Sequence, residues 1–285
     1  MEKINTQVLM SGVDYFGVEE LNPYSDASIQ PNLAKTKQEY KNLQKAFSQA
    51  DIEIIGTASP QDCQDGVYTA NWALCKDKKA IMASLPNMRS AEVPYARIAL
   101  ASLGFEIIEP PRGLRFSGQG DALPCGNYVF AGNGYRSDVE MQQFVADKLG
   151  YEVIGLQTIP VLDKENQPIV NKITGWADSF FYDIDLAISI LTPNLIAWCP
   201  EAFTPRSQDI MAKTSIEKIE VSLKEAKESF ACNLLSTGEI VIMSATAPDL
   251  KANIEAKGLK TITPDMTELS KGGGYIRCTT LTLSN

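Results

Sequence analysis

One arrangement of expected elements occurs several times along the chain: two short β-rich runs joined by a polar turn, then a helical stretch, then another strand. In the first occurrence these elements are expected, in order, at residues 67–74, 80–84, 90–103 and 105–109. Gly104 follows the helical stretch directly and is a good residue to end it. A unit that returns about every 50 residues cannot bury its apolar face alone, so its copies must pack against one another.

The copies extend over the whole chain. Three more follow at residues 120–154, 186–198 and 233–262. A fifth combines a helix at 33–50 and a strand at 52–55 with a hairpin drawn from both ends of the chain, at 276–283 and 8–11. The repeat predicts an α/β fold, a five-bladed pseudo-symmetric α/β propeller of ββαβ-type units. It would form one domain over residues 1–285 with both termini in one blade. The alternative is an ordinary α/β sandwich whose repetition is accidental.

Charge and hydropathy narrow the classes of partner. The formal net charge of -9 argues against nucleic acid and acidic membrane surfaces, because neither releases counterions to an acidic protein. The same charge suits a cationic small molecule. No run reaches the roughly 18 apolar residues that a membrane span needs. The polar start shows no secretory signal, so we expect a cytoplasmic protein.

The chain has six scattered cysteines, none in a CxxC pair, and no histidine at all. In a chain of this length, scattered cysteines are typical of reduced thiols rather than of a disulfide scaffold or a zinc site. Without histidine or a cysteine cluster, a transition-metal site is improbable. We therefore expect neither a metal nor a cofactor.

Seven short motifs stand in a fixed order over most of the chain. They are Asn22-Pro23, Asp-Gly-Val-Tyr-Thr-Ala-Asn at 65–71, Arg-Ser-Ala-Glu at 89–92, Gly-Gln-Gly-Asp at 118–121, Gly-Tyr-Arg-Ser-Asp at 134–138, Ala-Cys-Asn at 231–233 and Gly-Gly-Gly-Tyr-Ile-Arg-Cys-Thr at 272–279. In this order they resemble motifs of the guanidine-modifying enzymes, the pentein superfamily of arginine deiminases, dimethylargininases, arginine dihydrolase-like proteins and amidinotransferases. The resemblance implies the five-bladed propeller fold and a small guanidine or amidine as substrate or ligand.

The resemblance also implies binding roles for particular residues. Asp65 would hold the α-amino group of the substrate, and Arg89 and Arg136 would clamp its α-carboxylate, which a guanidinium fork matches in shape and charge. Asp185 would accept hydrogen bonds from the guanidinium. Asn71 would orient a water molecule or the ureido oxygen. The alternative for each is an ordinary surface or turn residue.

Cys278 matches the nucleophile of the superfamily. It would attack the guanidinium carbon, expel ammonia or an amine, and leave a covalent thiouronium for water to hydrolyse. The three glycines before it predict a flexible loop and an exposed thiol. The remaining cysteines are expected to be buried structural thiols: Cys63, Cys75, Cys125, Cys199 and Cys232.

Two positions depart from the superfamily pattern. Asp183 stands where relatives have the general acid/base histidine, and Ser117 stands where they have its glutamate partner. In one hypothesis Asp183, hydrogen-bonded by Ser117, is the proton carrier of an atypical hydrolase. In the other, the pocket senses or binds a guanidine or cationic amino acid without turnover. An amidinotransferase is a third alternative, and the sequence leaves open whether the chain forms a homodimer.

Overall fold

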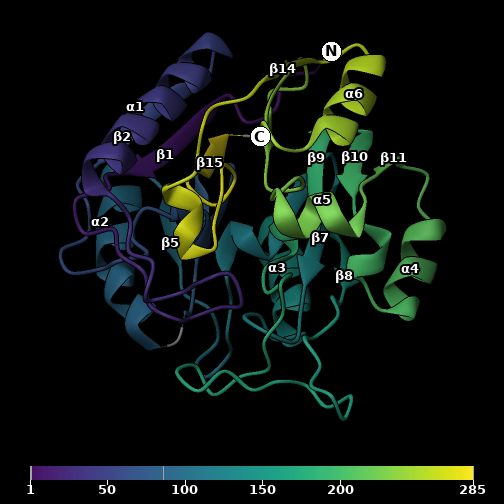
Figure 1. Cartoon of the computed structure of the whole chain (residues 1–285), viewed down its shortest axis with the longest axis horizontal. Helices are drawn as coiled ribbons and strands as arrows, with labels where there is room; N and C mark the ends of the chain where they lie inside the picture. Colours follow the sequence, from purple (N-terminus) through teal and green to yellow (C-terminus); the bar gives the residue numbers. More distant parts are fainter. Residues whose placement is uncertain (1, 86, 285) are drawn as a thin grey trace.

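The computed structural model describes residues 2–85 and 87–284, which form five small three-stranded sheets with helices around them (Figure 1). Each sheet combines an antiparallel pair of strands with a third strand that lies parallel to the second strand of that pair and follows it in the chain after a helix. This is the predicted propeller of ββαβ-type units, and the predicted α/β fold class is confirmed.

The sheets follow the chain in order. Four of them are β3 (Ala73–Lys76), β4 (Lys79–Met82) and β5 (Glu106–Ile108); β6 (Ala122–Cys125), β7 (Tyr128–Gly132) and β8 (Glu152–Leu156); β9 (Ile188–Thr192), β10 (Leu195–Trp198) and β11 (Glu217–Glu220); β12 (Leu235–Ser236), β13 (Ile240–Ile242) and β14 (Lys260–Ile262). The helices that precede the third strands are α2 (Val93–Ser102), α3 (Glu140–Leu149), α4 (Pro205–Ala212) and α6 (Pro248–Ala256). A short additional helix, α5 (Leu223–Glu228), lies between β11 and β12.

The fifth sheet joins the two ends of the chain. It contains β15 (Leu281–Ser284), β1 (Gln7–Ser11) and β2 (Glu53–Thr57), with α1 (Leu33–Gln49) between β1 and β2. In the antiparallel pair, Leu9 of β1 lies opposite Leu281 of β15. The ends of the chain therefore lie side by side in one blade.

Helix α1 shows how local sequence sets an element. The side chain of Asn32 accepts hydrogen bonds from the backbone N–H groups of Ala34 and Lys35 and so caps the start of the helix. Tyr40, Leu43 and Phe47 recur at helical spacing and are buried against the sheet. This helix ends within a residue of its predicted boundary.

The predicted strand at 67–74 is wrong over residues 67–72. Residues Thr69–Trp72 form a 3-10 turn, and β3 begins only after it. The Thr69 hydroxyl contacts the backbone oxygens of Leu9 at 2.9 Å and Thr279 at 3.0 Å. These contacts hold the segment away from the strand ladder.

Among the first strands of the sheets, β15 contacts β3, and β9 contacts both β6 and β12; these five are the inner strands of the propeller. A 3-10 turn leads into the start of β3. Similar 3-10 turns, Gly118–Gly120 and Ile184–Leu186, precede β6 and β9. The hairpin turns of the blades lie at the opposite end of the same strands, as the pairing in β3–β4 and β6–β7 shows. Side chains from several blades therefore meet where the inner strands begin. Within the described part of the chain, no helix is long and apolar enough to cross a membrane.

Candidate active site

Cys278 lies three residues before β15, at the end of the propeller where the inner strands begin. The residue is only 3% exposed, so the prediction of an exposed thiol is wrong. A Cβ atom at Gly274 would lie 2.6 Å from a ring carbon of Tyr68 and 3.0 Å from the Cβ of Cys278. Gly273 has φ +90°, a backbone conformation that favours glycine. The glycines thus allow close packing around the thiol.

The thiol of Cys278 is held between two polar side chains. It donates to Oδ2 of Asp185 over 3.4 Å and accepts from Nδ2 of Asn233 over 3.2 Å. Asn233 Oδ1 also accepts from the backbone N–H of Cys278 over 3.1 Å. Asn233 therefore fixes both the backbone and the sulfur. Sequence reasoning assigned it no role, although it ends the Ala-Cys-Asn motif.

Burial is the largest influence on the pKa values of Cys278 and Asp185. It raises the pKa of Cys278 well above its ordinary value, and the neighbouring carboxyl of Asp185 raises it further. Burial and the charge of Asp183 likewise raise the pKa of Asp185 well above its usual range. The thiol is therefore protonated at neutral pH in the unliganded site.

Asp183 is completely buried beside this pair. Its Oδ2 accepts from Nδ2 of Asn71 over 2.8 Å and from Nη1 of Arg136 over 3.3 Å. Its Oδ1, and Oδ1 of Asp185, are buried and receive no hydrogen bond from any described residue. Buried polar groups without partners are rare and call for an explanation. Two acceptor-only oxygens beside a thiol fit a cationic ligand rich in N–H donors.

Ser117 reaches Asp183 through an intermediary. The direct hydrogen bond expected between them is replaced by Asn71, whose Nδ2 donates to Oγ of Ser117 over 2.9 Å as well as to Asp183. Oδ1 of Asn71 accepts from Nη1 of Arg89 over 2.6 Å. The amide predicted to orient a water molecule thus bridges three side chains of the site.

Arg89 is buried and turned toward protein acceptors. Its Nε and Nη2 donate to the two carboxylate oxygens of Glu92 over 2.8 and 2.9 Å, and Nη2 also reaches the backbone oxygen of Tyr68. Oδ2 of Asp65, the residue expected to hold the α-amino group, lies 3.9 Å from Nε. Burial raises the pKa of Asp65 to about 6, against the opposing charge of Arg89. Glu92, which received no role from the sequence, is thus the principal counter-charge of Arg89.

This pairing predicts a large effect on stability. We expect Glu92→Gln to lower the free energy of unfolding by about 3 to 5 kcal/mol, because it leaves a buried guanidinium without its carboxylate. The exposed pair of Lys251 and Glu255 supplies the control, since Glu255→Gln should change stability by less than about 0.5 kcal/mol. Urea unfolding of both variants measures the difference. Equal, small losses would show that Glu92 does not stabilise Arg89.

Arg136 completes the cluster at its rim. Its side chain is 12% exposed, its guanidinium carbon lies 4.0 Å from the ring centroid of Tyr182, and it pairs with Asp183. The predicted site residues therefore form one contiguous cluster, linked through Asn71, Asp183 and the thiol. Among the residues that the structure describes, no group of three or more metal-ligating side chains is arranged to hold a metal ion.

Asp121, the last residue of the Gly-Gln-Gly-Asp motif, is a further buried carboxyl of the cluster. Its Oδ1 accepts from the backbone N–H of Ile184 over 3.0 Å, which anchors the turn between Asp183 and Asp185. Burial and the nearby charge of Asp183 raise its pKa to about 8. The motif pointed to this position, and its role in holding the turn follows only from the three-dimensional contact.

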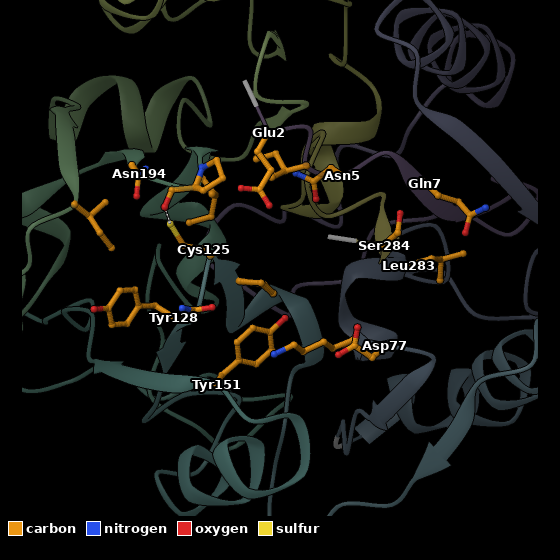
Figure 2. A pocket seen from close by; sticks show the side chains of 18 of the residues that line it. Glu2, Asn5, Gln7, Asp77, Cys125, Tyr128, Tyr151, Asn194, Leu283 and Ser284 are labelled. Atoms are coloured by element: carbon orange, nitrogen blue, oxygen red, sulfur yellow. Dashed lines mark hydrogen bonds between the residues drawn. The ribbon is translucent and has the colours of Figure 1, made fainter.

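A separate cavity of about 690 Å³ opens among the hairpin turns at the opposite end of the inner strands. Figure 2 shows Asn194 and Cys125 on one side of it and Ser284, Leu283 and Asp77 on the other. Among the described residues that line it, none belongs to the predicted site. The chemistry-bearing cluster and this cavity therefore occupy different ends of the propeller.

The chain is similar in sequence to several known proteins. The family described as N,N dimethylarginine dimethylhydrolase, eukaryotic, matches residues 125–284. The bifunctional arginine dihydrolase/ornithine cyclodeaminase ArgZ of Synechocystis sp. is 26% identical over 282 residues, 96% of this chain and 37% of ArgZ. The N(G),N(G)-dimethylarginine dimethylaminohydrolase of Mycobacterium tuberculosis is 26% identical over 263 residues, covering 92% of this chain and 80% of that protein.

A solved structure extends the likeness to the whole fold. The N-terminal domain of ArgZ, in a cysteine-to-serine mutant bound to substrate, matches with a TM-score of 0.88 and 25% identity over 98% of both chains. The present chain spans just over a third of the length of the first curated relatives that it matches, which are bifunctional. It belongs to the N,N-dimethylarginine dimethylhydrolase family, within the guanidine-modifying (pentein) superfamily.

Proposed function

We propose that the chain is a cysteine-dependent hydrolase of arginine or a related small guanidine or amidine. One observation carries the proposal: two buried carboxylate oxygens without partners, on Asp183 and Asp185, lie in the cluster that holds the Cys278 thiol. A guanidinium is planar, permanently charged and carries N–H donors around its edge. Seated between these oxygens, it would satisfy both and bring its central carbon to the sulfur.

The proposed reaction has two balanced steps. First, the Cys278 sulfur bonds to the guanidinium carbon, the thiol proton passes through a neighbouring carboxylate to the leaving nitrogen, and that C–N bond breaks. Ammonia leaves, and a cationic thiouronium remains on the sulfur. Water then adds to this carbon, the C–S bond breaks, and a ureido product, the free thiol and one proton result. Asp183 and Asp185 are the proposed proton carriers, in place of a histidine.

Relatives support this chemistry. ArgZ is an arginine dihydrolase, and an asparagine-to-serine variant of its N-terminal domain was solved covalently bound to a reaction intermediate, at 25% identity and a TM-score of 0.87. The relative from Mycobacterium tuberculosis acts on dimethylarginine, as its name states. A guanidine carried by an amino acid is therefore the substrate class that we propose.

The two predicted arginine clamps are not equivalent in this proposal. Arg89 gives its donors to Glu92, Asn71 and backbone oxygens, so little of its hydrogen-bonding capacity is left for a ligand. Arg136 lies at the rim, is partly exposed and pairs with Asp183 through one nitrogen. Arg136 is therefore the better candidate for the substrate carboxylate, and Arg89 for holding Asn71 in place.

A second candidate function is binding without turnover. It is favoured by the raised pKa of the buried Cys278 thiol, which the nearby carboxyl of Asp185 raises further. In this case the cluster would bind the same cation and stop there, as a sensor of a guanidine or cationic amino acid. Both candidates share the ligand and differ in chemistry.

Ammonia release from a panel of arginine, methylated arginines, agmatine and simple amidines, with products identified by mass, tests the proposal. Turnover of one guanidine, with a ureido product or its breakdown products, is the expected result. Binding that raises the melting temperature without any product would support the sensor. Neither binding nor turnover across the panel would contradict both candidate functions.

Binding should also release protons. Burial and the charge of Asp183 raise the pKa of Asp121 to about 8, so this carboxyl is mostly protonated at pH 7 in the unliganded site, and the same two causes raise the pKa of Asp185. A cation placed beside them favours their ionised forms and lowers both pKa values. Affinity should therefore increase as the pH rises from 6 to 8, with release of up to about one proton per ligand at pH 7. Calorimetry of Cys278→Ala in phosphate and in Tris measures this number, and proton uptake on binding would contradict the assignment.

A further inference from the structure

Arg277 is a buried cation with neutral partners. Its side chain lies in the interior, and the residue is only 5% exposed. Nη2 donates to Oε1 of Gln119 over 3.0 Å, and Nη1 donates to Oγ1 of Thr282 over 3.1 Å and to the backbone oxygen of Thr280 over 3.3 Å. With the described carboxylates it forms no ion pair. A charged group this deep is normally paired, so its isolation calls for an explanation.

The other arginines of the cluster behave differently. Arg89 lies against both oxygens of Glu92, and Arg136 pairs with Asp183. A charge with an opposite charge in contact presents little field beyond that contact. The field of Arg277 is not cancelled in this way, and the interior around it has a low dielectric, which lets the field extend to neighbouring groups.

The position of Arg277 brings that field to the nucleophile. It directly precedes Cys278, and its side chain lines a small cavity of about 20 Å³ together with Leu123 and Ser189. This small cavity shares Asn5 with the larger one in Figure 2. Arg277 is thus adjacent to the nucleophile in the backbone, and its guanidinium lies in the interior against Gln119, Thr280 and Thr282.

Several titratable or charged groups surround the thiol. They are the carboxyls of Asp185 and Asp183, the phenols of Tyr24, Tyr68 and Tyr182, and the guanidinium of Arg277. The carboxyls disfavour a thiolate, and the phenols are neutral because burial raises their pKa values. Burial raises the pKa of Asp185, and the charge of Arg277 opposes that rise. Burial lowers the pKa of Arg277, and the negative forms of Asp185 and Cys278 oppose that fall. In this set, Arg277 is the cation that lacks a carboxylate partner.

We propose that Arg277 is a positioning residue for the thiol chemistry: its buried guanidinium, free of carboxylate partners, supplies the positive charge against which the Cys278 thiolate forms. In a chain without histidine, this charge takes the place of an imidazolium beside the nucleophile. The catalytic purpose of this charge rests on the proposed function. The effect of the charge on the ionisation of Cys278 does not, and it is measured without any substrate.

The test is the rate at which iodoacetamide alkylates Cys278 between pH 6 and 10, read from the mass of the chymotryptic peptide that contains it. Arg277→Gln removes the charge and should lower the alkylation rate at pH 8 by about tenfold or more, which corresponds to a thiol pKa higher by at least one unit. Arg277→Lys keeps the charge and should stay within about threefold of the unmodified protein. Arg97→Gln, which removes an exposed arginine charge far along the chain, is the control and should leave the rate unchanged.

A further variant keeps the arginine and cancels its charge. Gln119→Glu places a carboxylate at the atom that now lies 3.0 Å from Nη2, and it should slow alkylation as Arg277→Gln does. This variant decides the matter if Arg277→Gln does not fold. The proposal is overturned if Gln119→Glu, folded, leaves the pH profile of alkylation unchanged. It is also overturned if Arg277→Lys slows alkylation as strongly as Arg277→Gln, because the hydrogen bonds rather than the charge would then matter.

These outcomes are independent of turnover. A charge-dependent alkylation profile in a protein that hydrolyses no guanidine would uphold the role of Arg277 and contradict the proposed function. Guanidine hydrolysis with an alkylation profile indifferent to Arg277 would do the reverse.

Discussion

Cys278→Ala should abolish guanidine hydrolysis and leave ligand binding nearly intact. The sulfur is the proposed nucleophile, and no other described cysteine contacts Asp183 or Asp185 through a hydrogen bond. Loss of a covalent nucleophile removes the whole two-step route, so we expect a fall of at least about 10⁴-fold in kcat. The carboxylate oxygens that receive the cation remain in place, and the dissociation constant measured by calorimetry should change little.

Cys125→Ala is the matched control for this experiment. Cys125 is also a buried free thiol, but it donates to the backbone oxygen of Pro193 over 3.3 Å, at the opposite end of the propeller from the cluster. Ammonia release by this variant should equal that of the unmodified protein. Comparable turnover in Cys278→Ala would mean that another group performs the attack.

The second large effect is expected at Asp183. Asp183→Asn keeps the shape of a fully buried side chain but removes its charge and one of its acceptor oxygens. The new amide would lose the charge that pairs with Arg136, and it would meet the Nδ2 donor of Asn71 or the ligand itself with a donor of its own. Loss of a proton carrier typically costs about 10² to 10⁴ in rate. We therefore expect kcat/KM to fall by at least about 10²-fold.

Asp147→Asn, at an exposed position of α3, is the control for this loss. Its kcat/KM and melting temperature should match those of the unmodified protein. A melting temperature for Asp183→Asn close to that of the control separates a defect in chemistry from a defect in folding. Retention of more than a third of the activity would exclude Asp183 from proton transfer.

The repeat in the sequence was sufficient to predict the fold because each unit carries local signals. Helix α1 has its own cap and its own apolar face, so its boundaries could be read from residues within it. The turn Thr69–Trp72 could not be predicted in the same way. Its conformation depends on Thr69 bonding to backbone oxygens of residues from both ends of the chain, Leu9 and Thr279.

The first residue of helix α3 also depends on a contact outside the helix. Within the copy of the repeat at 120–154, the sequence predicts a helix over residues 137–149, but α3 begins at Glu140. The hydroxyl of Ser137 accepts from the backbone N–H of Ser117 over 3.1 Å, a contact with the preceding loop. Helix propensity alone does not predict such contacts.

The candidate site, too, was predictable from the sequence only in part. Motif resemblance predicted which residues come together, and the structure places them in one cluster. Spacing in the sequence did not predict the hydrogen-bond partners of these residues, such as Glu92 for Arg89 and Asn233 for Cys278. The burial of the thiol follows from the packing of Gly274 against Tyr68, a contact between segments far apart in the chain.

The proposal depends most directly on a covalent bond between the substrate carbon and the sulfur of Cys278. Rapid acid quenching during turnover of the best guanidine in the panel, followed by peptide mass mapping, would detect it. We expect the peptide containing Cys278 to gain the mass of the substrate less ammonia, and to gain more in Asp183→Asn if the second step is slowed. Ammonia formation at the same time points with Cys278 recovered unmodified would contradict the covalent mechanism.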